Sequence, residues 1–281
     1  MKNKPILITG CSTGIGYHAA ITLQQRGYCV LATVRKAEDV KRLKQAGLKY
    51  VFELDLRSSE SIERGLKQAL SVTDGKLYAL FNNGAYGQPG AVEDLPRSAL
   101  LEQFETNVFG THELTTKVIP HLLTQASARI IQNSSILGFA AMPMRGAYNA
   151  SKFALEGLTD TLRMELSETN IKVSIIEPGP ILSSFRQNAI IALKENIDIS
   201  ASRHQSLYQG VLDRLSKKGP SSKFTLPPEA VVNKLIHALE SKWPKQRYYV
   251  TVPTYLLAYL RHFLPTSVMD ALVIKIAKSE G

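Results

Sequence analysis

Long apolar runs are absent from this chain of 281 residues. No stretch approaches the ~20 consecutive apolar residues of a membrane-spanning helix. The first apolar run, Ile6-Leu7-Ile8, is too short to be the core of a signal peptide. Cysteine is also scarce, since Cys11 and Cys29 are the only two and cannot make a disulfide framework. These absences argue against a membrane-spanning protein and a disulfide-rich secreted domain, and they predict a cytoplasmic protein with reduced thiols.

Signals for metal binding and nucleic-acid binding are missing as well. The six histidines show no His-x-x-x-His pair and no other spacing that suits metal ligation. No nucleic-acid-binding motif accompanies the basic residues. We therefore expect no metal site and no nucleic-acid partner.

Positive charge is present in excess, and it is unevenly placed. The formal net charge is +10, and from Arg214 to the end the chain has eleven Lys and Arg residues against four Asp and Glu, a charge of +7. Such a segment is attracted to an anionic membrane surface or a phosphorylated ligand, but it can equally be a solvated basic face. The content of 44% hydrophobic and 21% charged residues is that of an ordinary globular protein with a large core.

Short runs rich in β-branched residues alternate with longer amphipathic segments over the first two thirds of the chain. This alternation is typical of βαβ units around a parallel sheet, and several runs are almost entirely apolar, as strands covered on both faces are. The predicted strands span residues 5–9, 28–34, 49–54, 77–81, 128–133, 171–177 and 248–252. The predicted helices span residues 15–26, 37–46, 59–71, 97–123, 147–167 and 228–241. The expected fold class is therefore α/β.

The pattern changes after Pro178-Gly179-Pro180, which ends the sixth predicted strand. Residues 181–226 read as irregular, although apolar residues recur there at roughly helical spacing. Residues 253–278 read as two short helices separated by Pro265, with apolar stripes beside basic residues. These helices can pack on the domain's own core, cover the mouth of the substrate pocket, lie on a membrane surface or form a subunit interface. Because the chain has no linker and no repeat, we expect one domain, residues 1–252, with a helical C-terminal extension at 253–281.

A glycine-rich turn lies between the first predicted strand and the first predicted helix. Residues 9–16 read Thr-Gly-Cys-Ser-Thr-Gly-Ile-Gly. Gly10 allows a tight turn, Gly14 lets the backbone approach a pyrophosphate, and Gly16 lets the helix pack against the sheet. The helix N-terminus then offers free N–H groups to the phosphates. This turn predicts a dinucleotide site, in which the intervening residues Ser12, Thr13 and Ile15 also take part.

The end of the second predicted strand bears on the choice between NAD and NADP. An NAD site has an acidic residue there, which binds the ribose 2′-OH. Here residues 32–36 read Ala-Thr-Val-Arg-Lys, with no carboxylate. Arg35 is placed to hold a 2′-phosphate, and Ser12 in the glycine turn adds a hydroxyl. We therefore expect NADP(H), against the alternative that Arg35 is a surface residue and the cofactor preference is loose.

Tyr148 and Lys152 are four residues apart in a predicted helix, so their side chains share one face. An ammonium group beside a phenol favours the phenolate and lowers the pKa of the tyrosine from its usual ~10. The same spacing also fits an ordinary surface pair. The Tyr148–Lys152 pair therefore indicates an active site only when it is taken together with the other motifs in the chain.

Together these motifs resemble those of the short-chain dehydrogenase/reductase family. The resemblance covers residues 5–181, well over half of the chain. Besides the glycine turn and the Tyr148–Lys152 pair it includes Asp55-Leu56, Asn82-Asn83-Gly84-Ala85, Asn107, Ser134-Ser135 and Pro178-Gly179. In the family the second of these reads Asn-Asn-Ala-Gly, so its last two residues are exchanged here. The chain is most similar in motif to the NADP-linked branch that holds 17β-hydroxysteroid and retinol dehydrogenases, and its C-terminal part resembles that of bacterial aldehyde and ketone reductases.

The resemblance implies a Rossmann-type doubly wound parallel sheet and an NADP-dependent oxidoreductase. Tyr148 would be the general acid or base, and Lys152 would hold the nicotinamide ribose and adjust the tyrosine pKa. Ser135, which lies 13 residues before Tyr148, is expected to bind the substrate oxygen, and Asn107 to hold a water. The expected cofactor-binding residues are Gly10, Ser12, Thr13, Gly14, Ile15, Gly16, Arg35, Asp55, Leu56, Asn83, Gly84, Tyr148, Lys152, Pro178, Gly179 and Ile181.

By resemblance, residues 181–226 contain the substrate lid. From Ile181 to Leu212 the chain is apolar enough to form a lid over a hydrophobic pocket. It has few acids and no cluster of arginines suited to a carboxylate or phosphate substrate, so we expect an apolar aldehyde or ketone, or the matching alcohol. A homodimer or homotetramer is expected, and peripheral membrane contact through the C-terminus stays open. The alternative is an NADP-binding sensor or scaffold without turnover, because a fold does not determine a function. The complete catalytic set favours the enzyme.

Overall fold

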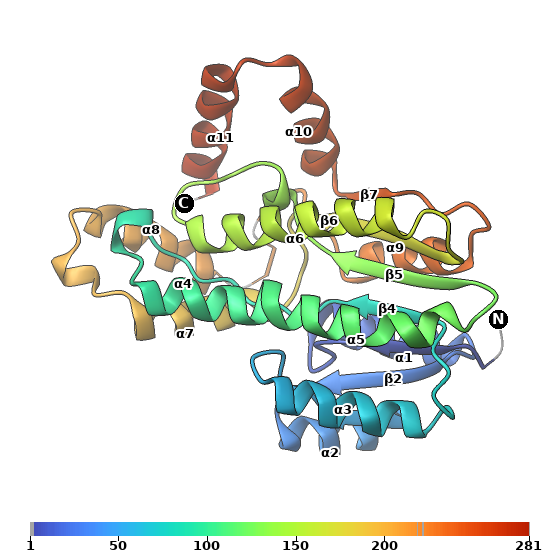
Figure 1. The fold of residues 1–281 in the computed structure, drawn as a ribbon. Coiled ribbons are helices and arrows are strands. Elements are labelled where there is room, and N and C mark those ends of the chain that lie inside the picture. Colours follow the sequence, from blue (N-terminus) through green and yellow to red (C-terminus); the bar gives the residue numbers. More distant parts are fainter. Residues whose placement is uncertain (1–2, 218, 221, 281) are drawn as a thin grey trace.

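Seven strands form one parallel sheet at the centre of the structure (Figure 1). This structure, a computed structural model, describes residues 3–217, 219–220 and 222–280. The strand order is β3-β2-β1-β4-β5-β6-β7, and each neighbouring pair is parallel. The strands are β1 (Pro5–Ile8), β2 (Cys29–Val34), β3 (Tyr50–Glu53), β4 (Ala79–Asn82), β5 (Ala128–Asn133), β6 (Ile171–Pro178) and β7 (Arg247–Val250). The predicted doubly wound, Rossmann-type sheet is confirmed.

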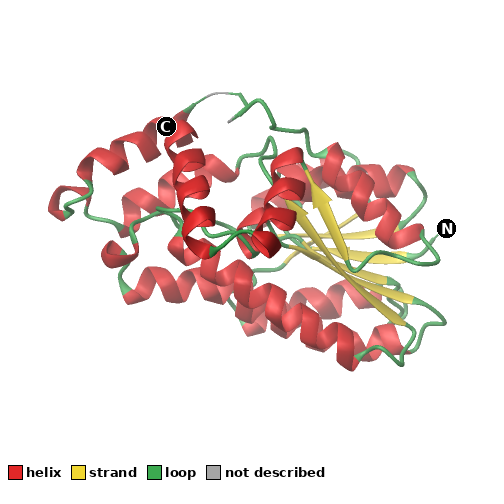
Figure 2. Cartoon of the chain, turned by 90° about the horizontal axis from the view of Figure 1, so that it is seen from above, coloured by secondary structure: helices red, strands yellow, loops and turns green. Residues whose placement is uncertain are grey.

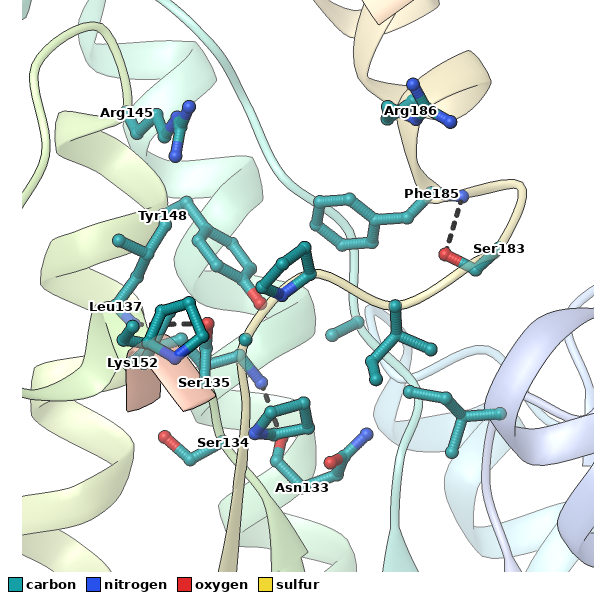
Figure 3. Close-up of a pocket in the computed structure, with 18 of the residues that line it drawn as sticks. Asn133, Ser134, Ser135, Leu137, Arg145, Tyr148, Lys152, Ser183, Phe185 and Arg186 are labelled. Carbon is teal, nitrogen blue, oxygen red and sulfur yellow. Dashed lines mark hydrogen bonds between the residues drawn. The ribbon is translucent and has the colours of Figure 1, made fainter. Parts of the chain in front are cut away.

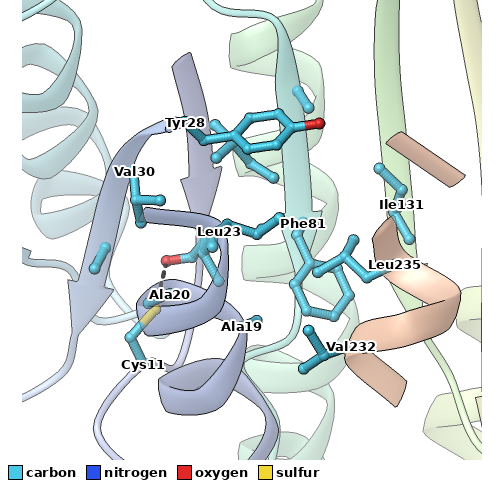
Figure 4. Close-up of a cluster of buried hydrophobic side chains, with 14 of the residues drawn as sticks. Cys11, Ala19, Ala20, Leu23, Tyr28, Val30, Phe81, Ile131, Val232 and Leu235 are labelled. Atoms are coloured by element: carbon cyan, nitrogen blue, oxygen red, sulfur yellow. Dashed lines mark hydrogen bonds between the residues drawn. The ribbon is translucent and has the colours of Figure 1, made fainter. Parts of the chain in front are cut away.

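Helices cover both faces of the sheet, which explains why its strands are so apolar. The covering helices are α1 (Gly14–Gln25), α2 (Ala37–Gln45), α3 (Ser59–Ser71), α5 (Thr111–Leu123), α6 (Gly146–Glu165) and α9 (Glu229–Glu240). On one face Leu23 of α1 and Leu235 of α9 are fully buried in a cluster with Phe81 of β4 (Figure 4). On the other face α3 and α5 contribute Ile62 and Leu114 to a second cluster with Leu80 of β4. The two cores hold the carboxyl ends of the strands in fixed positions.

Residues 97–123 differ from the single regular helix that the sequence predicts. They form α4 (Arg97–Phe104), a π-helical segment (Glu105–Gly110) and α5 in direct succession. The backbone of Leu56 passes so close to Gly110 that a Cβ atom there would lie 1.7 Å from the Leu56 carbonyl oxygen. A π segment inside an α-helix often marks a functional position. Here it contains Asn107.

Residues 181–226, which the sequence suggests to be irregular, are largely helical. They contain α7 (Phe185–Asn196) and α8 (Gln205–Ser216), which pack on one another through buried Leu193, Tyr208 and Val211. The apolar residues at helical spacing were the correct signal for these helices. Figures 1 and 2 agree in placing α7 and α8 beyond the end of the sheet to which the strands point.

The C-terminus forms the two helices that the sequence predicts, α10 (Val252–Phe263) and α11 (Thr266–Glu280), separated by Pro265. One face packs on the domain, since Leu257 and Val273 are buried in a cluster with Met142. The outer face remains exposed, with the Phe263 side chain 80% accessible to solvent. Among the residues described, no helix has the length and apolar character needed to cross a membrane. The structure therefore shows intramolecular packing for one side of the C-terminal pair.

Candidate active site at the carboxyl ends of the strands

A single pocket of about 930 Å³ lies at the carboxyl ends of the strands. In open α/β sheets this edge is where ligands bind. Most of the expected cofactor-binding and catalytic residues line it, namely Gly10, Ser12, Thr13, Gly14, Ile15, Asn83, Gly84, Ser135, Tyr148, Lys152, Pro178, Gly179 and Ile181. Gly16, Arg35, Asp55, Leu56 and Asn107 lie outside its lining. The fold thus gathers positions that are up to 171 residues apart in the chain.

The glycine turn leaves the start of α1 open to an anion. Gly10 and Gly14 have φ angles of 68° and 57°, which favour glycine. A Cβ atom on Gly16 would lie 2.3 Å from the Gly10 carbonyl oxygen, so Gly16 stands behind the turn and permits its close packing. No side chain caps the N-terminus of α1, and its first turn contains no acidic residue. The backbone N–H groups of the first turn of α1 lack a partner within the helix, and this turn borders the pocket. The glycine turn therefore fits the pyrophosphate of a dinucleotide.

Hydrogen bonds join the glycine turn to the ends of β4 and β5. The Thr9 hydroxyl accepts from the backbone N–H groups of Asn83 (2.9 Å) and Gly84 (2.8 Å). The Asn83 amide donates to the Thr9 carbonyl (3.0 Å) and accepts from the Asn133 amide (2.9 Å). A Cβ atom on Gly10 would lie 2.7 Å from the Gly84 Cα atom. The last two residues of the motif Asn82-Asn83-Gly84-Ala85 are exchanged relative to the family. Glycine, the smallest residue, therefore occupies position 84, where the loop after β4 approaches the glycine turn most closely.

The end of β2 presents two arginines rather than one. Arg35 is exposed directly after the strand, as the sequence predicts. Arg42 of α2 donates to the Ser12 carbonyl in the glycine turn (2.8 Å) and pairs with Asp39. Sequence reasoning missed Arg42. Its only signal in the sequence is that it follows Arg35 closely, in the next helix. The Asp55 carboxylate forms an ion pair with Arg57 (2.9 Å).

Tyr148 and Lys152 share one face of α6, and Ser135 follows β5 beside them (Figure 3). Burial raises the pKa of Tyr148 to about 12, and a hydrogen bond with the Ser135 side chain offsets part of that rise. Burial lowers the pKa of Lys152 to about 8, against the attraction of Glu156. The Lys152 ammonium donates to the Asn133 carbonyl (2.7 Å) and lies 5.7 Å from the centre of the Tyr148 ring.

The expected lowering of the Tyr148 pKa by Lys152 is therefore not what the structure shows. Low-dielectric surroundings disfavour the ionised form of both side chains, and burial is the main cause of the raised Tyr148 pKa. The phenol is held in its protonated form at neutral pH.

Asn107 is buried in the π-helical segment and uses its amide on protein groups. Its nitrogen donates to the Tyr86 carbonyl (3.0 Å) and the Ser151 hydroxyl (3.1 Å), while its oxygen accepts from the Tyr86 N–H (3.2 Å). Asn107 thus ties the loop after β4 to the residue that precedes Lys152. The expected role of Asn107 as a water ligand stays a prediction.

Three further features border the pocket, beyond the residues that the motifs select. The Phe185 ring packs edge-on against Tyr148, with ring centres 5.3 Å apart. Figure 3 shows this pair between Arg145 and Arg186. The C-terminal helices supply an apolar wall, formed by Leu256, Leu257, Leu272 and Ile276. The sequence left the mouth of the substrate pocket as one place for these helices, beside the core, a membrane surface and a subunit interface, and in the structure they line the pocket.

The two serines after β5 differ in their contacts, which makes their predicted roles separable. Both serines line the pocket, but the Ser134 hydroxyl donates to buried Glu156 (2.6 Å), whereas the Ser135 hydroxyl accepts from the Leu137 N–H (3.1 Å) and lowers the pKa of Tyr148 from the value that burial alone would give. We expect Ser135→Ala to lower kcat by roughly 10²-fold, as the loss of a donor to a developing oxyanion does. Ser134→Ala should instead cost about 1–3 kcal/mol of stability, because a buried carboxylate oxygen loses its donor. Steady-state rates and thermal melts of both variants would show the reverse pattern if Ser134 were the substrate-binding serine.

This geometry defines an α/β protein in which a glycine turn, Ser135, Tyr148 and Lys152 border one pocket. The family model for short chain dehydrogenases matches residues 4–192. The chain is 41% identical to the uncharacterized oxidoreductase YbbO of Escherichia coli K12, over 97% of this chain and 95% of that protein. It is 30% identical to human 17-beta-hydroxysteroid dehydrogenase type 1, over 89% of this chain and 78% of that protein. The chain belongs to the short-chain dehydrogenase/reductase family, as its motifs suggest, and this family consists of oxidoreductases.

Solved structures of this fold show the same architecture. A Burkholderia phymatum short chain dehydrogenase/reductase in complex with NAD superposes with a TM-score of 0.77 and 24% identity, covering 92% of each chain. A Burkholderia cenocepacia short chain dehydrogenase in complex with NADP gives a TM-score of 0.75 and 21% identity, covering 96% of this chain and 98% of that one. At this identity the likeness concerns the fold, and the two neighbours differ in nucleotide.

Proposed function

We propose that this protein is an NADP-dependent oxidoreductase that interconverts an apolar aldehyde or ketone and its alcohol. The carrying observation is that one pocket contains both the uncapped N-terminus of α1 and the Tyr148–Ser135 hydrogen-bonded pair. A hydride donor bound at the glycine turn and a carbonyl bound at Tyr148 would then share one cavity. The alternative, a sensor or scaffold without turnover, does not explain why a phenol, a hydroxyl and an ammonium group converge there.

The protein's own groups would handle the proton and the developing charge. NADPH supplies the hydride when bound. Tyr148 donates its phenolic proton to the substrate oxygen in the reductive direction and takes it back in oxidation. Tyr148 is protonated at neutral pH and can donate, although burial makes its phenol a weaker acid. The Ser135 hydroxyl stabilises the negative charge on the same oxygen. Lys152 keeps a positive charge below this pair and would hold the nicotinamide ribose.

The preference for NADP follows from the charges at the end of β2. Arg35 is exposed there, Arg42 reaches the glycine turn, and Asp39, the nearby acid, is paired with Arg42. We expect NADPH to bind more tightly than NADH. Arg35→Asp should reverse that order, because a carboxylate repels the 2′-phosphate and accepts from the ribose 2′-OH. Titration of both reduced cofactors by fluorescence checks this. Equal affinities in the unaltered protein would show that Arg35 does not select the cofactor.

The substrate class follows from the walls around Tyr148. Phe185, Met142 and the four apolar residues of α10 and α11 line this part of the pocket, which fits a medium or long apolar carbonyl compound. The name of the human relative, a hydroxysteroid dehydrogenase, supports an apolar substrate. The test is an NADPH-oxidation screen across aldehydes, ketosteroids, retinal and small ketones. Turnover of small polar ketones alone would contradict the proposal, and cofactor binding without turnover of any carbonyl would favour the sensor.

We also propose a homodimer or homotetramer and keep peripheral membrane contact of the C-terminal helices as a prediction. Tyr259 and Phe263 on the outer face of α10 are 62% and 80% exposed, with Arg261 beside them. An aromatic and basic surface of this kind can rest on an anionic bilayer or on a second subunit. Vesicle flotation and analytical ultracentrifugation would distinguish the two.

A further inference from the structure

The pocket lining is strongly basic. Besides Lys152 it includes five cationic residues, Arg145, Arg186, Arg214, Lys217 and Lys223. The part of the lining that the structure describes contains no Asp and no Glu. The members of this cationic cluster are spread between residues 145 and 223, and only Arg214, Lys217 and Lys223 belong to the basic C-terminal segment seen in the sequence. Tertiary structure thus adds cations to residues 181–212, which by themselves contain no cluster of arginines suited to an anionic substrate.

Four of these cations come from the lid, and tertiary contacts bring them together. Arg186 donates to the Lys217 carbonyl (3.0 Å) and also bonds the Gly219 carbonyl, which joins the start of α7 to the end of α8. Leu226 pairs with residues 180–182 through two backbone hydrogen bonds (3.0 and 3.1 Å), and this contact brings the loop that carries Lys223 to the pocket. Phe185, next to Arg186, packs on Tyr148. The lid cations therefore begin at Arg186, which directly follows the residue that packs on the proposed proton donor.

Helix electrostatics account for part of this cluster only. Arg214 and Lys217 lie at the C-terminal end of α8, where the helix dipole favours cations. Arg186 lies in the first turn of α7, where the dipole disfavours them, and that turn has no acidic residue. In the described part of the chain Arg186 bonds only backbone carbonyls, and Lys217 and Lys223 form no ion pair with a carboxylate. Arg186, Lys217 and Lys223 are thus paired with no carboxylate in the described part of the lid.

Another part of the pocket lining is apolar. Leu256 and Leu257 of α10 and Leu272 and Ile276 of α11 form it. Tyr148 lines the same cavity, so a carbonyl held there would share it with both the lid cations and this apolar wall. We propose that the substrate is amphipathic, with an apolar chain along α10 and α11 and an anionic group, such as a carboxylate, held by the lid cations. This inference rests on the proposed function and refines its substrate class.

A competing explanation is that the lid cations bind the phosphates of the cofactor. The experiment must therefore separate cofactor binding from substrate binding. Lys217→Gln with Lys223→Gln removes two exposed charges of the lid. Lys67→Gln with Lys172→Gln is the matched control, because these lysines are exposed, line no part of the pocket and change the net charge equally.

The substrates are an oxo-carboxylate and its methyl ester with the same carbon chain. In the unaltered full-length protein with NADPH, kcat/KM should be higher for the carboxylate, and this advantage should shrink with salt. The lid variant should lower the ratio of the two kcat/KM values by roughly tenfold, since each exposed ion pair contributes up to about 1 kcal/mol. The control variant should leave the ratio within about twofold.

Binding without turnover provides the second readout. With NADP⁺ present, decanoate should raise the melting temperature more than decanol does, and the lid variant should lose that difference. A preference for the ester, or equal protection by acid and alcohol, would overturn the inference while leaving the proposed function standing. A lid variant that loses as much affinity for NADPH as for decanoate would assign the lid cations to the cofactor, and it would also overturn the inference. Decanoate protection without any carbonyl reduction would instead contradict the proposed function alone.

Discussion

Tyr148→Phe is expected to lower kcat by about 10³-fold, because general acid catalysis typically contributes 10²–10⁴-fold. The change removes the phenolic oxygen, the group that the pocket presents beside Ser135. The ring itself remains, so its packing against Phe185 is kept. NADPH affinity and melting temperature should stay close to those of the unaltered protein. Stopped-flow turnover with a substrate from the screen, together with a fluorescence titration of NADPH, measures both quantities.

Tyr259→Phe is the matched control for this variant. It removes the same atom from an exposed ring on α10 that does not line the pocket. Near-normal turnover by Tyr148→Phe would show that the proton comes from another group, and the proposed mechanism would then be wrong. A collapse of NADPH binding would point to a role in cofactor positioning.

Arg247→Met is expected to destabilise the protein by about 3–5 kcal/mol, the usual result of breaking a buried ion pair on one side. Arg247 of β7 donates to Glu156 (2.7 Å), Glu177 (2.7 Å) and Asp160 (2.6 Å). The Glu156 and Glu177 side chains are only 8% and 0% exposed, so without the arginine both buried carboxyl groups would lose the cation that they share. A fall of the melting temperature by about 10 °C would follow.

The pH dependence distinguishes this charge effect from simple loss of packing. Burial, with repulsion from Glu156, raises the pKa of Glu177 to about 8 from an ordinary 4.5. A raised carboxyl pKa means that the folded state binds the proton more tightly, so this group's stabilising contribution is complete below pH 4.5 and is lost as pH rises through 8. The deficit of Arg247→Met should therefore widen with rising pH, as the carboxylates ionise without a partner.

Arg163→Met provides the comparison for that series. Arg163 pairs with Asp160 on the surface of α6, and exposed pairs contribute about 0–1 kcal/mol. Urea unfolding of both variants at low and high pH measures the difference. A deficit in Arg247→Met that is small, or the same at all pH values, would mean that the carboxylates are stabilised by other groups.

Local pattern was sufficient for the fold and for the residues of the glycine turn. Apolar strands and amphipathic helices alternate along the chain, and their periodicity reports which faces are buried. The uncapped turn at Gly14 and the four-residue spacing of Tyr148 and Lys152 are likewise local, because neighbours along one helix determine them. For the same reason Pro265 correctly separated the two C-terminal helices. The π-helical segment around Asn107 was not foreseen, since the approach of Leu56 to Gly110 creates it.

The sequence by itself determined the fold class, the family and the positions of the proposed catalytic residues. Tertiary structure alone decided the electrostatics of the site. The pKa of Tyr148 is raised mainly by burial of its side chain. Arg247 reaches Glu156 from 91 residues away, and Arg186 meets the end of α8 from 31 residues away. Such effects depend on distance in space and on exclusion of water, and neither can be derived from the spacing of residues along the chain.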